Sequence, residues 1–284
     1  MVTNKSAHGM DWGIYQRVGD NWRIGTTKVG GCLERITNID DITSDFLVKF
    51  GNDFGPEFIH PHKLPHPNWH FLDNSEIPQL LNPNPANPAG LKTFVRFPRG
   101  LFTVQQNSRP DARRLSEYIE SVAPGTTLEN IIRPIPVRTR NTKRVLLCPS
   151  TPNCHQYYYG ISQREWINRW QGWCEHNGYT AVVRKKPERP QRVRDPMSRL
   201  YEHLVIEDYF CTISQHSVAA IESIMAGVPA VVTGPHPAGD LATDQKEFVL
   251  GQLRIPDVNQ VWNWILRIAS NTYHKSELFQ GKWR

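Results

Sequence analysis

The sequence has few cysteines, no long apolar run and no phosphate-binding loop of the Walker type. The cysteines are odd in number, dispersed and without a Cys-x-x-Cys pair, so neither a disulfide scaffold nor a zinc knuckle is predicted. No apolar stretch approaches the ~20 residues that cross a bilayer. The opening MVTNKSAHGMDW lacks the apolar core of a signal peptide. These absences favour a folded protein in a reducing cytoplasm.

A metal site is not predicted either. His60 and His62 stand close together, but no carboxylate at a defined metal-ligand spacing accompanies them. The prolines interleaved with these histidines favour a plain loop.

The 284-residue chain carries a net charge of +6, and its basic residues gather in two stretches. One is RPIPVRTRNTKR at residues 133–144, and the other is RKKPERPQRVRDPMSR at residues 184–199. Such stretches attract phosphates, either those of a nucleotide or those of a nucleic acid. A solvated basic surface is the alternative interpretation.

The residue pattern changes near residue 140. Before it, prolines, glycines and asparagines separate short apolar pieces, and residues 82–90 are typical of a loop. A strand is predicted at Phe94–Pro98 and a helix at Pro110–Val122. We therefore predict an N-terminal domain over residues 1–140 and a second domain over residues 141–284.

From residue 144 onward, short apolar runs alternate with helical patterns. Strands are predicted at residues 145–149, 180–184, 209–213 and 229–233, helices at residues 164–176, 196–203, 214–227 and 258–270, and a polar tail at the C-terminus. Because each strand is almost wholly apolar, we expect an α/β fold with a parallel sheet covered on both faces. Such sheets bind ligands beyond the carboxyl ends of their strands.

One segment, CTISQHSVAAIESIMAGVPAVVTG at residues 211–234, is the most informative. An apolar strand leads into a serine-rich turn and a helix whose buried stripe is predicted to be Val218, Ile221 and Met225. Ser214 or Ser217 is expected to cap this helix, where free N–H groups would meet a phosphate.

Glu222 stands about one turn into the same helix, beside the apolar stripe. A carboxylate at such a place is costly unless it has a partner, and a ribose diol is a suitable one.

This segment resembles the donor half of the GT-B glycosyltransferases, and it is similar to the related capsule-polysaccharide and nucleotide-sugar epimerase enzymes. In that family a strand, a Ser-containing turn, a helix bearing a Glu and a Gly-x-Pro strand hold the nucleotide diphosphate and its ribose. The resemblance covers residues 144–239 and implies a GT-B-like fold of two Rossmann-like domains, with a reduced N-terminal one here. An ordinary βαβ unit of a doubly wound protein is the alternative.

The resemblance also implies a set of donor-binding residues after the predicted strands. Residues 148–160, CPSTPNCHQYYYG, form a polar loop in this interpretation, and a basic pair after the second strand would neutralise the leaving diphosphate. The predicted donor-binding residues are Ser150, Thr151, Arg184, Lys186, Ser214, His216, Ser217, Glu222, Gly234 and His236, with Asp240 as an alternative contact to the sugar.

A catalytic base would come from the N-terminal domain in this family. Asp11 and His8 are the candidates, because inverting transfer needs a carboxylate or an imidazole at the acceptor hydroxyl. Retaining transfer needs no such base, and a plain turn is the alternative role for both residues.

The expected co-substrate is a nucleotide sugar, a UDP-sugar first, with no metal strictly required. The basic linker and the abundant Trp, Tyr and Arg favour a nucleic-acid acceptor, and the chain resembles compact phage-encoded glycosyltransferases. The predicted acceptor is therefore a hydroxymethylated pyrimidine flipped out of phage DNA in the host cytoplasm. A capsule or surface polysaccharide is the alternative, and a nucleic-acid-binding protein without catalysis is a third hypothesis.

Overall fold

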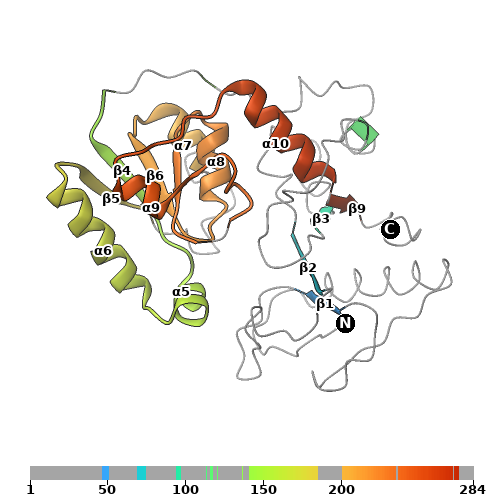
Figure 1. Cartoon of the computed structure of the whole chain (residues 1–284), viewed down its shortest axis with the longest axis horizontal. Helices are drawn as coiled ribbons and strands as arrows, with labels where there is room; N and C mark the ends of the chain where they lie inside the picture. The colour runs from blue at the N-terminus through green and yellow to red at the C-terminus, as the bar shows by residue number, and fades with distance from the viewer. Residues whose placement is uncertain are drawn as a thin grey trace. The chain divides into compact units, whose positions relative to one another are not determined.

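The computed structural model describes residues 47–50, 69–74, 94–96, 113, 116–117, 120, 136, 141–184, 200–234, 236–270 and 272–274 (Figure 1). The chain separates into two compact units. The first comprises Met1–Pro78, Pro83–Leu128 and Leu266–Arg284, and the second comprises Gln79–Asn82 and Glu129–Ile265.

The first unit contains a four-stranded sheet of mixed direction. Its strands are β1 (Leu47–Phe50), β2 (Trp69–Asn74), β3 (Phe94–Arg96) and β9 (Thr272–His274), in the order β1-β2-β3-β9. The first pair is parallel and the other two pairs are antiparallel. The predicted strand at Phe94 is confirmed. The predicted polar tail is wrong over Thr272–His274, because this segment pairs with a strand far away in the sequence.

The second unit is built on a five-stranded, entirely parallel sheet. Its strands are β4 (Arg144–Cys148), β5 (Thr180–Val183), β6 (Cys211–Ser214), β7 (Ala230–Val232) and β8 (Thr243–Asp244), in the order β5-β4-β6-β7-β8. All four predicted strands are confirmed to within two residues, and the α/β fold class is confirmed for this unit. The prediction missed β8, whose two residues are too few to show a pattern.

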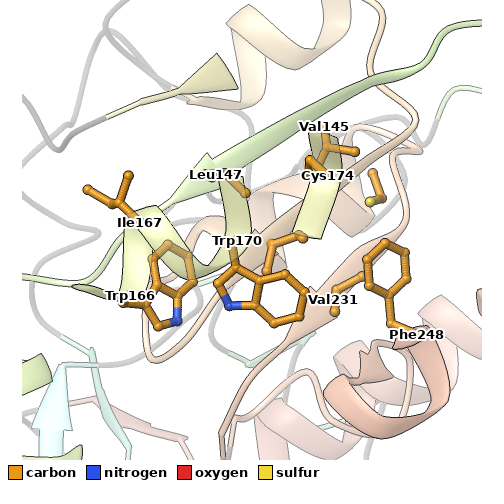
Figure 2. Close-up of a cluster of buried hydrophobic side chains, with 10 residues drawn as sticks. Val145, Leu147, Trp166, Ile167, Trp170, Cys174, Val231 and Phe248 are labelled. Atoms are coloured by element: carbon orange, nitrogen blue, oxygen red, sulfur yellow. The ribbon is translucent and has the colours of Figure 1, made fainter. Parts of the chain in front are cut away.

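Helices cover both faces of this sheet. Helix α6 (Gln163–His176) lies on one face and packs Trp166, Ile167 and Trp170 against Val145 and Leu147 of β4 (Figure 2). These side chains recur at helical spacing, and the N-cap Ser162 accepts a hydrogen bond from the Glu165 N–H, so the local sequence specifies the helix.

On the other face lie α7 (Leu200–Ile206) and α8 (Ala219–Met225) (Figure 1). Ile221 and Met225 of α8 are fully buried, as the apolar stripe predicts. The prediction is wrong for Val218, which is 42% exposed because the helix begins one residue later, at Ala219.

Two further helices follow β8, and the second of them continues beyond the last residue of the second unit, Ile265. Helix α9 (Gln245–Val249), which the sequence pattern did not predict, starts in a capping box between Asp244 and Glu247. Helix α10 runs over Val258–Ser270, the predicted range.

A further difference lies directly after β4. The polar loop predicted at residues 148–160 is instead a helix, α5 (Pro152–Tyr159), over most of its length. Thr151 caps this helix by accepting a hydrogen bond from the Cys154 N–H, Pro152 begins it, and Gly160 ends it in the left-handed conformation. The loop was predicted because the segment is polar, and the prediction overlooked the residues that begin and end the helix.

Candidate functional site

The strand order creates a topological switch point between β4 and β6. From β4 the chain crosses to β5 on one side, and from β5 it returns to β6 on the other side of β4. The loops after β4 and β6 therefore diverge, and ligands of open α/β sheets bind in the crevice that this leaves at the carboxyl edge. Cys148 and Ser214 are paired at this edge, so the two loops start side by side.

Two predicted residues, Ser150 and His216, lie beside the switch point together with Tyr159, which was not predicted. Ser150 is 6% exposed, and its hydroxyl accepts a hydrogen bond of 3.0 Å from the His216 N–H. The His216 Nε2 in turn forms a hydrogen bond with the Tyr159 hydroxyl at the end of α5. The loops after β4 and β6 are thus tied together by polar contacts that hold the His216 imidazole in one orientation.

Gly234 completes this group from the end of β7. A β-carbon at this position would overlap the Tyr159 hydroxyl and lie 3.0 Å from its Cζ atom. The glycine predicted to allow a close approach to a ligand therefore allows the close approach of Tyr159. Burial raises the pKa of the Tyr159 hydroxyl above its usual range, so the group is a neutral donor and acceptor.

Two charged residues lie near the end of β4 as well. Burial raises the pKa of the Cys148 thiol to about 12, and the charge of Arg184 lowers this pKa while the charge of Glu222 raises it. Arg184 follows β5 and its N–H donates to the Leu147 carbonyl oxygen at 2.9 Å. Both predicted charged residues are half-buried and act on one thiol beside the switch point.

The serine turn does not play its predicted capping role. Ser217 accepts a hydrogen bond of 3.3 Å from the Ala219 N–H, but the N-cap of α8 is Val218 and no side chain caps this helix. Ser214 does not cap the helix: it is fully buried in β6, five positions before the first helical residue.

His236 is built into the fold. Its Nδ1 accepts a hydrogen bond from the Ala238 N–H at 3.0 Å, so the ring proton is on Nε2, which donates to the Ser217 carbonyl oxygen at 2.8 Å. The ring therefore joins the loop after β7 to the turn before α8. A contact of His236 with a donor sugar stays a prediction, as does one of Asp240.

Of the remaining predicted residues, Thr151 is exposed and caps α5. Asp11, His8 and Lys186 lie outside the described residues.

Within the parts of the chain that are described, no group of three His, Cys, Asp or Glu side chains could hold a metal ion. In those same parts, no helix has the length and apolar character to cross a membrane.

Sequence reasoning missed Tyr159 and His155 as members of this region. Both belong to α5 and are one turn apart, so they share a face of that helix. The sequence contains a signal for this: Thr151 and Pro152 can begin a helix and Gly160 can end it. A helix over these residues places the rings of His155 and Tyr159 on one face.

Comparisons with known proteins found similarity to solved structures alone. No family model matches the chain, and no curated protein matches it.

The chain is similar in fold to a solved Kdo transferase.

That structure is Thermosulfurimonas dismutans KpsC, beta Kdo 2,7 transferase, which is 14% identical, with 92% of this chain and 94% of that chain covered and a TM-score of 0.45. A second similar structure is Thermosulfurimonas dismutans KpsC, beta Kdo 2,4 transferase, 13% identical, with coverage of 91% and 90% and a TM-score of 0.41.

Proposed function

We propose that this protein is a glycosyltransferase that moves a sugar from a nucleotide-sugar donor to a hydroxyl acceptor. The observation that carries the proposal is the convergence at one switch point of Ser150, His216, Arg184 and Glu222. These residues follow β4, β5 and β6 in the chain, and the parallel sheet brings them to one edge.

The chemistry of these groups fits a nucleotide sugar. Transfer breaks the bond between the sugar's anomeric carbon and a phosphate oxygen, and forms a bond from that carbon to the acceptor oxygen. The leaving nucleotide gains negative charge, which the fixed cation Arg184 would stabilise. Glu222 would accept hydrogen bonds from the ribose hydroxyls, a bidentate arrangement open to a carboxylate. The acceptor proton goes to a base, for which Asp11 and His8 stay predictions.

The first test is a thermal-shift screen with UDP-, GDP- and CMP-sugars. A donor present at one hundred times its dissociation constant stabilises the fold by about 2.7 kcal/mol and raises the melting temperature accordingly. A UDP-sugar stays a prediction, and the screen compares the three nucleotides directly. If none of them raises the melting temperature, the transferase proposal fails.

A charge-neutral variant then tests the site itself. Glu222→Gln should weaken donor binding by about 1.5–3 kcal/mol, since a hydrogen bond to a charged group is lost. Glu175→Gln, on the exposed surface of α6, is the matched control and should bind like the wild type. Equal affinities for all three proteins would remove Glu222 from the site.

For the acceptor, we rank a saccharide of a capsule or cell surface above DNA. The DNA hypothesis used the basic stretch 133–144, together with the abundant Trp, Tyr and Arg and the resemblance to phage-encoded enzymes. Arg144, at the end of this stretch, pairs with Glu207 at 3.0 Å and lies 4.7 Å from the centre of the Tyr209 ring. The charge of this one residue, among five basic residues in the stretch, is therefore paired within the fold and gives less support to a DNA acceptor.

Radiolabelled donor distinguishes the two acceptors. The protein is incubated with the donor that the screen identifies and, in parallel, with capsule oligosaccharide and with DNA containing hydroxymethylcytosine or hydroxymethyluracil. Label in the oligosaccharide supports our ranking. Label in the DNA would reverse it and restore the phage-type acceptor.

A further inference from the structure

Three residues of the second unit hold polar atoms that are buried and without a hydrogen-bond partner. They are His155 at both ring nitrogens, Ser214 at Oγ and Gln215 at Oε1. The exposed fractions of these residues are 0%, 0% and 2%. Buried polar groups are almost always bonded in proteins, so a local group of such exceptions needs an explanation.

The three residues belong to one region. Ser214 and Gln215 are adjacent at the end of β6, and the Gln215 side chain bonds to the Tyr159 hydroxyl. His155 lies one turn before Tyr159 on the same face of α5.

A series of contacts links His155 to the backbone of Ser214. The His155 ring lies 5.3 Å from the Trp166 ring, measured between centroids. The Trp166 Nε1–H donates to Thr233 Oγ1 at 3.2 Å, and the Thr233 N–H donates to the Ser214 carbonyl oxygen at 2.9 Å. His155 is thereby connected to the end of β6 through two neighbouring side chains.

All three residues present uncharged polar groups. Burial lowers the pKa of His155 to about 4, so its imidazole is neutral at physiological pH, with one nitrogen donating and the other accepting. A serine hydroxyl donates and accepts, and an amide oxygen accepts. A set of this kind suits a neutral partner rich in donors and acceptors, and it lacks the positive charge that favours a phosphate.

We propose that His155, Ser214 and Gln215 form a recognition surface for an uncharged polar part of the donor, either the edge of its base or the hydroxyls of its sugar. This inference rests on the proposed transferase function and extends it. Arg184 would serve the phosphates, and the neutral set would decide which donor is accepted.

Access to this surface depends on α5. Tyr159 is hydrogen-bonded to Gln215 and to His216, so α5 must shift for a ligand to take the place of these contacts. An isolated helix of eight residues has little stability of its own, so α5 is held in place mainly by its tertiary contacts.

A pair of serine variants tests the proposal. Ser214→Ala removes the unpartnered hydroxyl and should leave the melting temperature unchanged or raise it, while lowering donor affinity about tenfold, which is about 1.4 kcal/mol. Ser223→Ala is the matched control. This serine is equally buried, but its hydroxyl accepts from Thr212 Oγ1 at 2.8 Å and donates to the Val228 carbonyl oxygen at 2.9 Å. The control variant should lose stability and keep its donor affinity.

The ligand series locates the contact on the donor. Affinities of wild type and Ser214→Ala are measured by calorimetry for the free nucleotide and for the nucleotide sugar. A loss with both ligands assigns the base edge, and a loss with the nucleotide sugar alone assigns the sugar. Equal affinity of both proteins for both ligands overturns the inference.

His155→Phe provides a second variant, since phenylalanine keeps the ring contact with Trp166 and removes both nitrogens. A raised melting temperature with weakened donor binding is the expected result. A raised melting temperature with unchanged donor binding would show that His155 has no role in recognition. If the wild type itself binds no nucleotide sugar, the transferase proposal fails, and this inference fails with it. If the wild type binds and both variants bind equally well, this inference alone fails.

Discussion

The Tyr159 hydroxyl lies so close to Gly234 that a β-carbon on residue 234 would overlap it. The same hydroxyl bonds to His216, so one small residue after β7 determines where an imidazole after β6 can be held. This relationship joins three strand-end loops, and it makes the site sensitive to side-chain volume at a position without a functional group.

Gly234→Ala should therefore displace the Tyr159 ring. We expect a loss of about 1–3 kcal/mol in the free energy of unfolding, the usual cost of overpacking, together with weakened donor binding. Chemical denaturation measures the first effect. In a Tyr159→Ala background the same substitution should cost little, and additive effects of the two changes would contradict the close approach. Gly172→Ala, at an exposed position of α6 with open space around it, should stabilise the helix slightly.

Of the positive-φ glycines Gly227 and Gly178, we expect Gly227 to lose more stability when it is replaced by alanine. Gly227 has φ +66° and its missing β-carbon would overlap the Pro136 carbonyl oxygen, whereas Gly178 has φ +73° and open space. Gly178→Ala should cost about 1 kcal/mol for the left-handed conformation alone. Gly227→Ala should cost about 2 kcal/mol more, because backbone must move. Equal melting temperatures of the two variants would argue against the contact with Pro136.

The pH dependence of stability should carry a contribution from His155. Its pKa is about 4 in the folded protein and about 6.5 in an unfolded chain. Between these values the unfolded chain binds a proton that the folded protein does not, so stability falls as the pH is lowered from 6.5 toward 4. The slope is up to about 1.4 kcal/mol per pH unit for this one proton. Denaturation curves of wild type and His155→Gln isolate the contribution, and parallel pH profiles would refute it.

Arg184→Gln should act mainly on the chemical step if the transferase proposal holds. Loss of a cation that faces the leaving nucleotide is expected to lower kcat by about 100-fold, in the range seen when one charge-stabilising donor is removed from an active site. Arg169→Gln, an exposed substitution on α6, serves as the control. A variant with wild-type kcat would leave Arg184 with a structural role only.

Local patterns were sufficient for four of the five strands of the second unit and for helix α6. The apolar runs that became β4 and β6 could be recognised because a strand buried on both faces is continuously hydrophobic. The tryptophans of α6 could be placed because burial against a sheet imposes helical spacing on them. The edge at which we expect ligands to bind followed from the parallel direction of the strands.

Other features depended on residues that are distant along the chain. Helix α5 contains mostly polar residues, so periodicity gave no indication of it, and its position is decided by the contact of Tyr159 with a residue 57 positions away. Strand β9 forms because β3 offers an unpaired edge to it, which no local window reveals.

By itself, then, the sequence determined an α/β unit with a parallel sheet and a row of polar residues at the strand ends, because burial and chain direction leave a periodic record in the residues. Only the tertiary structure decided which of those residues meet. It gave His216 a tyrosine partner, used His236 to join two loops and left the Ser214 hydroxyl buried without a partner. Such pairings depend on how loops from different strands pack together, and packing between distant segments has no periodic signature in the sequence.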